Sequence, residues 1–450
     1  MFYATFLYFL TLTFSIPAFL ISTRNGFNPF VRVFSHMQRA ITADLLIDGK
    51  GDVIKDAVVL ISKDRIQQVG ASEEVDIPDG VEVLHTSVLM PGMMDAHTHF
   101  LGTKTLNFGL WMQDTDAMRA MRATKEVHDM LLSGYTAARD VGSALSLSLK
   151  RIINEGTILG PRIFAAHRAL SQTAGHGDVH SFPIESVRHQ DGWIARLVDG
   201  VDEARKATRE TLRMGADLIK VFATGGVMSE LDHPHQVQFT MEELLAIIQE
   251  ARRYGVFVSA HAHGVGGIEQ AVKAGVNTVE HAMYLNQKPE LIELMKEKNV
   301  ILVPTLIIVK LIVERGEELG FPGYAIEKAK EGFENHVESI KMAVAADLPI
   351  AAGSDFLGPP LSPYGFGNAR ELELLHNVGL KPMDVIRAAT GLAAATAGPR
   401  SKNVGTIEPG KFADFLFLDK NPLDDVTLLQ SRENIKVVIK GGEVVVDRRN

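Results

Sequence analysis

Two histidines, His97 and His99, stand one residue apart at the end of an apolar run, and this spacing can bind a metal ion. The run covers residues 88–94 (VLMPGMM) and predicts a β-strand. Side chains on a strand alternate between its two faces, so the two imidazoles point the same way. Imidazole is a common ligand of zinc-like ions, and this pair therefore supplies half of a metal site.

Two other histidine pairs have the same spacing but different surroundings. His233 and His235 lie in a polar segment with a proline between them, which predicts a solvated loop. His261 and His263 instead follow the strand-like run 256–260 (VFVSA), as the first pair follows its own run. We therefore expect the pair at 261 and 263, and not the pair at 233 and 235, to belong to a site.

Strand-like runs alternate with helical patterns through the middle of the chain. The clearest helix starts at a capping box of Thr240 and Glu243 and is predicted to end at Gly255. Repeated alternation of this kind favours a (β/α)8 TIM barrel. A doubly wound α/β sheet is the alternative, weakened because no Gly-x-Gly-x-x-Gly motif follows the first run. The strand-like runs are 88–99, 135–141, 162–167, 217–223, 256–261, 276–281, 300–304 and 349–355.

Both ends of the chain are rich in short strand patterns. Three such patterns lie between residues 43 and 69, and a strand followed by a hairpin lies between residues 415 and 446. Neither end has enough strands to bury a face alone, so we predict that the two ends pair into one small β-sandwich domain. The predicted boundaries are 37–90 and 399–450 for the β-domain and 91–398 for the barrel.

The carboxyl ends of barrel strands converge on one mouth, so the polar residues there can be examined together. His281 ends the run 276–281 one repeat after His261, and this recurrence favours a ligand over a hydrogen-bonded core histidine. Asp355 follows an apolar run, where an unpaired carboxylate is costly, so a metal or a salt bridge must neutralise it. The candidate metal ligands are His97, His99, Lys220, His261, His281 and Asp355.

Lys220 lies in the middle of the apolar run 218–222 (LIKVF), where an amine is unexpected. An ion pair with an acidic neighbour is one explanation. Burial also lowers the pKa of a lysine and favours the neutral amine, which can add carbon dioxide to form a carbamate. Such a carboxylated Lys220 could bridge two ions about 3.5 to 4 Å apart, with the bridging water acidified for attack. We therefore expect two divalent metal ions, Zn²⁺ by the choice of ligand atoms, with Mn²⁺ or Co²⁺ as alternatives.

The composition excludes several classes of protein. The chain has 450 residues and no cysteine, which excludes disulfides, thiolate ligands and a cysteine nucleophile. Its 46 basic and 55 acidic residues give a net charge of −9 without a basic patch, so we expect no nucleic-acid partner. We expect a small-molecule substrate and a homo-oligomer.

The first 36 residues are separate from this pattern. Residues 1–22 carry no charged side chain, and their length approaches the ~20 residues that span a bilayer, although Pro17 interrupts them. They are interpreted as a targeting segment, as a membrane anchor, or as sequence upstream of a start at Met37. We assign residues 1–36 to an apolar N-terminal targeting or anchor segment. A targeting segment predicts a secreted or membrane-associated protein, and otherwise the protein is cytoplasmic.

These motifs together resemble the amidohydrolase superfamily, in its imidazolonepropionase-like branch. The matching segments are 91–99 (PGMMDAHTH), 219–227 (IKVFATGGV), 259–264 (SAHAHG), 280–281 (EH), 353–355 (GSD) and 405–414 (GTIEPGKFAD). Residues 169–178 and 225–229 are also similar to segments of the Xaa-Pro dipeptidases and the ochratoxin-hydrolysing amidohydrolases. The resemblance covers roughly residues 40 to 446.

The resemblance implies a role for each candidate residue. One metal ion would be held by His97, His99 and Asp355, the other by His261 and His281, with carboxylated Lys220 bridging them. Asp355 would take a proton from the attacking water and deliver it to the leaving nitrogen. His263 would polarise the substrate carbonyl or stabilise the oxyanion.

Two further polar positions follow predicted strands. His176 lies in a glycine-flanked loop after the third strand, where it is either a substrate contact, for instance to a carboxylate, or an ordinary loop histidine. Arg139 and Asp140 end the second strand and are interpreted as a structural ion pair.

The leading function is hydrolysis of an amide or peptide C–N bond in a small N-acyl amino acid or Xaa-Pro-type dipeptide. A deaminase, or a hydrolase of cyclic amides or lactones, on the same scaffold is the first alternative. Mononuclear deaminases of this superfamily generally lack the lysine, so Lys220 argues against them. The second alternative is a non-catalytic scaffold, which the complete set of candidate ligands disfavours.

Overall fold

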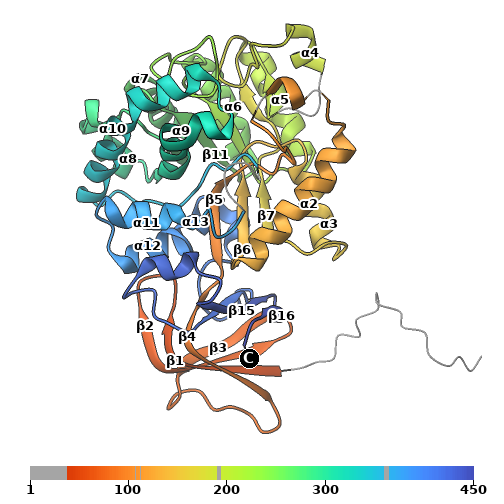
Figure 1. Ribbon diagram of the computed structural model, residues 1–450, viewed down its shortest axis with the longest axis vertical. Helices are drawn as coiled ribbons and strands as arrows, with labels where there is room; N and C mark the ends of the chain where they lie inside the picture. Colours follow the sequence, from red (N-terminus) through yellow and green to blue (C-terminus); the bar gives the residue numbers. More distant parts are fainter. Residues whose placement is uncertain (1–37, 107, 112, 190–193, 359–363, 450) are drawn as a thin grey trace, which may run out of the picture. The chain divides into compact units, whose positions relative to one another are not determined.

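The computed structural model describes residues 38–106, 108–111, 113–189, 194–358 and 364–449 (Figure 1). Residues Met37–Asn450 form one compact unit. The apolar segment 1–36, interpreted above as a targeting or anchor segment, lies outside the described residues. Within the described ranges, no helix has both the length and the apolar character needed to cross a bilayer.

Parallel strands form the barrel that the sequence predicts. The strands β5 to β7 pair in parallel, and so do β10 to β13. Between the two groups, Asp217 N donates to Ala165 O at 2.8 Å, and β8 pairs with both β10 and β9. The strands are β5 (Met93–Thr98), β6 (Tyr135–Asp140), β7 (Arg162–Ala165), β8 (Ala169–Ser171), β9 (Ala195–Leu197), β10 (Leu218–Phe222), β11 (Phe257–Ala262), β12 (Thr278–His281) and β13 (Ile301–Val303).

The eighth run, predicted over 349–355, is not a regular strand, yet it occupies the eighth position of the barrel. It joins its neighbours through two isolated parallel bridges, Ile350 with Leu302 and Phe356 with Thr98. Asp355 has a φ of +57°, a left-handed backbone conformation outside the β region. The barrel is therefore closed by an extended segment that bends at one of the predicted ligands.

Helices follow most strands and cover the outside of the barrel (Figure 1). The predicted capping box at the start of α6 is present, because Thr240 Oγ1 accepts from Glu243 N and Glu243 Oε2 accepts from Thr240 N. The helices are α1 (Phe108–Trp111), α2 (Asp116–Leu132), α3 (Ser146–Asn154), α4 (Ile184–His189), α5 (Val201–Arg213), α6 (Met241–Arg253), α7 (Val265–Ala274), α8 (Glu290–Glu297), α9 (Leu306–Leu319), α10 (Gly323–Ala345), α11 (Arg370–Asn377), α12 (Pro382–Ala388) and α13 (Gly391–Ala395).

The two chain ends form one sheet, as predicted. In the described residues its strand order is β16-β15-β14-β4-β1-β2-β3, with β4 and β14 joining the two ends. Its halves enclose a common core that includes Ile41, Val59, Phe415 and Ile439, which makes the domain a β-sandwich. The strands are β1 (Gln38–Ile47), β2 (Val53–Ser62), β3 (Arg65–Ala71), β4 (Glu82–Pro91), β14 (Phe415–Leu418), β15 (Ile435–Lys440) and β16 (Glu443–Asp447).

Gly92 marks the passage from the β-domain to the barrel. The run 88–99, predicted as one strand, is divided here between β4 and β5. A Cβ atom added at Gly92 would lie 2.0 Å from Thr136 Oγ1, so the close approach of the neighbouring strand requires glycine. The β-domain thus continues directly into the strand that carries His97 and His99.

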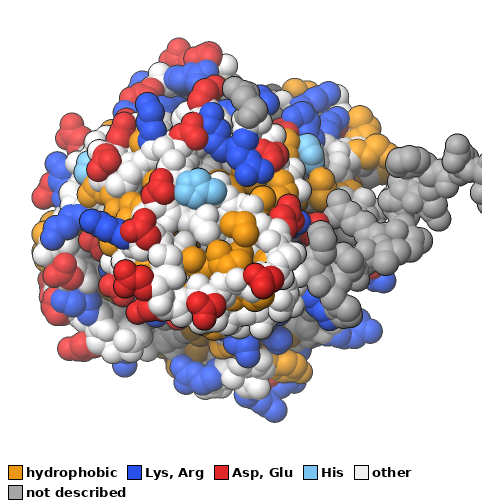
Figure 2. All heavy atoms as spheres, turned by 90° about the horizontal axis from the view of Figure 1, so that it is seen from below, with side chains coloured by type: hydrophobic (Ala, Val, Ile, Leu, Met, Phe, Trp, Pro, Cys, Tyr) orange, Lys and Arg blue, Asp and Glu red, His pale blue; other side chains and the backbone are white. Residues whose placement is uncertain are grey.

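The surface charges are mixed by sign. On the face shown in Figure 2, the lysine and arginine side chains of the described residues are interspersed with aspartate and glutamate. Neighbouring charges of opposite sign reduce the field that such a face presents to a charged partner. This face therefore does not present the strong single-sign field expected at a binding surface for a highly charged partner.

Candidate metal centre

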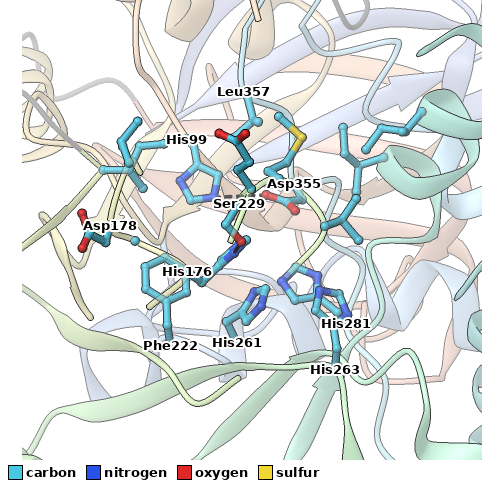
Figure 3. Close-up of a pocket in the computed structure, with 18 of the residues that line it drawn as sticks. His99, His176, Asp178, Phe222, Ser229, His261, His263, His281, Asp355 and Leu357 are labelled. Atoms are coloured by element: carbon cyan, nitrogen blue, oxygen red, sulfur yellow. Dashed lines mark hydrogen bonds and ion pairs between the residues drawn. The ribbon is translucent and has the colours of Figure 1, made fainter. Parts of the chain in front are cut away.

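The predicted ligands lie together in a pocket at the carboxyl ends of the barrel strands (Figure 3). The histidines and Lys220 lie in a barrel strand or directly after one, and Asp355 lies in the eighth segment of the barrel, so the barrel brings together residues that are far apart in the sequence. All are buried except Asp355, whose side chain is 20% exposed. The pocket is lined by His97, His99, Lys220, His261, His281 and Asp355, together with His176 and His263.

One cluster of ligand atoms consists of His97, His99 and Asp355, with the atoms within 4.8 Å of one another. The Nε2 atoms of His97 and His99 lie 3.3 and 3.1 Å from the same Asp355 Oδ1 atom. Zinc bonds to nitrogen and oxygen are about 2.0 to 2.2 Å long. Two ligand atoms on one tetrahedral ion are therefore separated by roughly the distances seen between these nitrogen and oxygen atoms. The cluster therefore has the donor atoms and the spacing for one divalent ion.

Hydrogen bonds orient both imidazoles of this cluster. His97 Nδ1 lies 2.7 Å from Glu280 Oε2, and His99 Nδ1 lies 2.9 Å from Gly142 O. Metal-binding histidines usually donate their second ring N–H to a carboxylate or a backbone carbonyl, which fixes the tautomer. In both rings Nε2 is thereby the nitrogen left for the ion.

The second cluster contains His261, His263 and His281, again with ligand atoms within 4.8 Å of one another. His281 Nδ1 lies 2.6 Å from Thr305 Oγ1, which leaves Nε2 for an ion. His261 is held through the other nitrogen, because its Nε2 lies 3.2 Å from Gly225 O. The chain therefore provides a second group of imidazole nitrogens suited to a cation.

His263 is the member of this cluster that the sequence assigned to the substrate. Its ring stacks on that of His281 with centroids 4.8 Å apart. Its Nδ1 atom is buried and has no hydrogen-bond partner among the described residues. The geometry accommodates both a metal ligand and a contact to the substrate carbonyl at this position.

Lys220 is buried, with 1% of the residue exposed, and its Nζ atom makes no hydrogen bond with a described residue. Burial lowers the pKa of this amine to about 8. Burial lowers the pKa values of His261 and His281 well below the usual range, and the Lys220 charge adds a smaller contribution in the same direction. The expected alternative, an ion pair with an acidic neighbour, is not formed within the described part of the chain. A buried amine without a partner fits a site completed by a further group.

Glu280 is the most important residue that the sequence did not identify. It is fully buried and accepts from Arg139 Nη2 at 2.8 Å and from Ser259 Oγ at 2.7 Å, in addition to its contact with His97. Burial would raise its pKa, but Arg139, Lys220 and His97 together lower the pKa well below the usual range. The available signal was an acidic residue inside the buried run 276–281, because a buried charge requires a partner.

The interpretation of Arg139 and Asp140 as an ion pair is wrong. Arg139 pairs with Glu280, whereas Asp140 accepts from Phe100 N at 2.8 Å. Adjacent residues of a strand point to opposite faces, so Arg139 and Asp140 cannot reach each other. Arg139 thus supports His97 through Glu280.

Two residues distant in sequence support the backbone of the site. His336 Nε2 of α10 lies 3.0 Å from His281 O and 2.9 Å from Pro304 O. Tyr364 OH lies 2.8 Å from His99 O and 3.0 Å from Phe356 O, so its one hydrogen is shared between these two carbonyl groups. The sequence assigned no role to either residue.

The backbone is strained at the ligands. His281 and Asp355 have φ angles of +71° and +57°, and Thr305, which holds His281, has +55°. Such left-handed conformations cost of order 1 to 3 kcal/mol each for residues other than glycine and persist where the surroundings fix them. Strain concentrated at two of the candidate ligands supports a functional origin for the arrangement.

His176 lies in the pocket that holds the candidate metal ligands, while the pair at 233 and 235 is not part of the pocket lining. The His176 ring stacks on the His261 ring with centroids 4.3 Å apart (Figure 3). The rings of His233 and His235 instead stack on each other, in a segment where His235 is exposed. The structure thus places His261 and His263 in the pocket lining, which does not include His233 or His235.

The wall of the pocket beyond the histidines is mainly apolar. Helix α9 contributes Ile308, Val309 and Ile312. The other apolar contributors include Val179, Ile194, Phe222, Met228, Tyr324 and Leu357. Such a wall with polar groups at its base is typical of a small-molecule site.

Comparison with known proteins identifies the family. A family model described as the amidohydrolase family matches residues 88–445. The chain belongs to the amidohydrolase family. Ochratoxinase from Aspergillus niger is 36% identical to this amidohydrolase over 424 residues, covering 90% of this chain and 86% of that protein. The crystal structure of A. niger ochratoxinase matches with a TM-score of 0.83 and 34% identity, over 91% of this chain and 96% of that one.

Two further relatives place the amidohydrolase within its family. The crystal structure of a Xaa-Pro dipeptidase with bound methionine in the active site matches with a TM-score of 0.81 and 30% identity, over 91% of this chain and 100% of that one. Imidazolonepropionase from Alkaliphilus oremlandii is 23% identical over 440 residues, covering 88% of this chain and 92% of that protein. The resemblance inferred from the motifs is confirmed, and the protein is a metal-dependent amidohydrolase.

Proposed function

We propose that this amidohydrolase cleaves the amide or peptide C–N bond of small N-acyl amino acids or Xaa-Pro-type dipeptides with two divalent metal ions. The observation that carries the proposal is Lys220, a buried amine that has no hydrogen-bond partner among the described residues and lines the same pocket as both ligand clusters. The names of two relatives, ochratoxinase and a Xaa-Pro dipeptidase, support this substrate class.

In this proposal His97, His99 and Asp355 hold one metal ion and His261 and His281 hold the other. Lys220, carboxylated on its Nζ atom, would be a ligand of both. Zn²⁺ is the ion we expect from nitrogen and oxygen donors without sulfur. When bound, the ions would acidify a water molecule and polarise the scissile carbonyl group.

Asp355 and His263 are the residues proposed to act on the reacting atoms. Burial would raise the pKa of Asp355, but His97 and His99 lower it below the usual range, so the carboxylate is ionised. An ionised and partly exposed carboxylate at the pocket can accept a proton from water and pass it to the leaving nitrogen. His263, with a buried ring nitrogen that has no hydrogen-bond partner in the described part of the chain, would polarise the carbonyl oxygen.

Removal of the metal ions is expected to abolish hydrolysis, and addition of Zn²⁺ to restore it. We expect two metal ions per chain by plasma emission spectroscopy, measured beside a screen of Xaa-Pro dipeptides and N-acyl amino acids. Replacing His235, which is exposed, by alanine should change neither the number of metal ions per chain nor the rate of hydrolysis. Fewer than two ions per chain would exclude the binuclear site, and activity confined to lactones or cyclic amides would exclude the substrate class.

The apolar wall predicts a preference for substrates with a bulky apolar group. Truncation by Ile308→Ala should lower kcat/KM for leucyl or phenylalanyl substrates about tenfold relative to glycyl ones, since a lost side-chain contact of about 1.4 kcal/mol is a factor of ten. Ile307→Ala is the matched control, because Ile307 is buried on the same helix outside the pocket lining. The prediction fails if both variants show the same ratio of rates as the wild type.

A further inference from the structure

The segment between β10 and α6 forms a loop over the metal centre, residues 225–232, which we call the 225–232 loop. Its organising group is the Asp232 carboxylate, which is buried. Asp232 accepts from Gly226 N at 3.2 Å, from Gln238 Nε2 at 3.0 Å and from the hydroxyl group of Ser229. The loop is thus closed around a single buried negative charge.

Hydrogen-bond direction links this charge to His176. The Ser229 hydroxyl donates its only hydrogen to Asp232, so Ser229 Oγ must accept from His176 Nδ1, which lies 2.7 Å away. His176 N also donates to Gln238 Oε1 at 2.9 Å. The imidazole is therefore held through its backbone and through Nδ1, and Nε2 remains for a molecule in the pocket.

Lys328, on α10, holds the 225–232 loop through hydrogen bonds to its backbone. Its Nζ atom donates to Ser229 O at 2.6 Å, to Asp232 O at 2.5 Å and to Gly226 O at 3.3 Å. It also lies 3.8 Å from Asp232 Oδ1, and its side chain is only 12% exposed. An ammonium group has three hydrogens, and here the loop accepts all of them, so Lys328 has none left for a substrate.

The loop backbone also touches the His176 ring directly. A Cβ atom added at Gly226 would lie 2.1 Å from His176 Cε1, so the ring packs against bare backbone at this point. The carbonyl group of the same glycine accepts from Lys328. A movement of the loop away from Lys328 therefore moves the surface on which the imidazole rests.

We propose that Lys328 is a positioning residue that sets the orientation of His176 in the active site through Ser229 and Asp232 of the 225–232 loop. The inference rests on the proposed function, and it adds to that function the substrate contact by His176, which lines the same pocket. It assigns α10 two roles at the site, because His336 of the same helix supports His281. If Lys328 served only to stabilise the fold, its replacement would lower activity by the same factor for all substrates and in all variants of the site.

The test compares Lys328→Met and Lys328→Arg with the control Lys330→Met, which removes an exposed lysine of the same helix. We expect Lys328→Met to lower kcat/KM about 10- to 100-fold, as for other residues that support active-site ligands, with unchanged metal content. Arginine keeps the charge and the donors, so Lys328→Arg should recover most of the loss. Lys330→Met should match the wild type.

A double-mutant cycle separates positioning from general stabilisation. If Lys328 acts through His176, Lys328→Met should cost less than about twofold in a His176→Ala background, because the group that it positions is already absent. Equal losses in the two backgrounds would overturn the proposal.

Two measurements do not depend on activity. Glu230 is exposed within the loop, so a glutamate-specific protease should cleave after it much faster in Lys328→Met than in the wild type. A crystal structure of Lys328→Met should show a rotated His176 ring, and an unmoved ring would overturn the proposal. If the wild type hydrolyses none of the tested substrates, the proposed function fails, while these two measurements still decide the role of Lys328.

Discussion

Lys220→Ala is expected to lower kcat/KM by about 10³-fold or more, because loss of metal-assisted chemistry removes several kcal/mol of transition-state stabilisation. Lys220 is the one candidate ligand whose burial has no compensating contact among the described residues. Its interactions reach both clusters, so its removal should affect the occupancy of both metal ions. Steady-state kinetics and metal analysis of the purified variant measure the two effects together.

The chemistry at Lys220 can be tested separately from its presence. Formate or acetate added to Lys220→Ala should restore part of the activity, because a small carboxylate fits the space and replaces the carbamate oxygens. Lys220→Met fills the same space with an apolar chain and should not be rescued. Growth with ¹³C-labelled bicarbonate should give a carbamate signal in the wild type that both variants lack. Undiminished hydrolysis by Lys220→Ala would exclude the proposed centre.

The parts of this site that were predictable follow from local rules. His97 and Asp355 could be placed because each comes directly after an apolar run, and the barrel brings such positions to one mouth. The Thr240 capping box was predictable because it depends on residues close in sequence. The pairing of the β-rich ends was predictable because neither end has enough strands to cover its own apolar face.

The parts that were missed depend on contacts between distant segments. Glu280 lies 183 residues from His97 and 141 from Arg139, so no local sequence pattern predicts the hydrogen bonds between them. His336 contacts the backbone of His281 from a helix 55 residues away. The eighth barrel position was predicted as a strand from its apolar residues, but the left-handed conformation of Asp355 is imposed by the site and not by the sequence around it.

The support beneath His97 shows why these distant contacts matter. Glu280 and Arg139 are fully buried, and burying two charges is favourable only when their hydrogen bonds are satisfied. Glu280 meets this condition with donors from Arg139, Ser259 and His97. The carboxylate held there accepts the hydrogen of His97 Nδ1 and so fixes the tautomer of the ring. The ion pair therefore serves the candidate metal site in addition to the barrel core.

Asp355→Asn is the second variant with a large expected effect. Asparagine keeps the shape of the side chain and one oxygen ligand, but it cannot accept the proton of the attacking water. We expect kcat to fall by about 10²- to 10⁴-fold, the usual contribution of general acid–base catalysis, with at least one metal ion retained. Asp202→Asn, which removes an exposed carboxylate on α5, should leave kcat unchanged.

The leaving group distinguishes the two roles proposed for Asp355. An alkylamine must receive a proton as the C–N bond breaks, whereas the alkoxide or phenoxide of an ester can depart without one. The loss in Asp355→Asn should therefore be largest for amides of basic amines and smaller for aryl esters of the same acyl group. If the carboxylate served only as a metal ligand, both series would lose activity equally. A difference that grows with the basicity of the leaving group would instead show that this carboxylate delivers the proton.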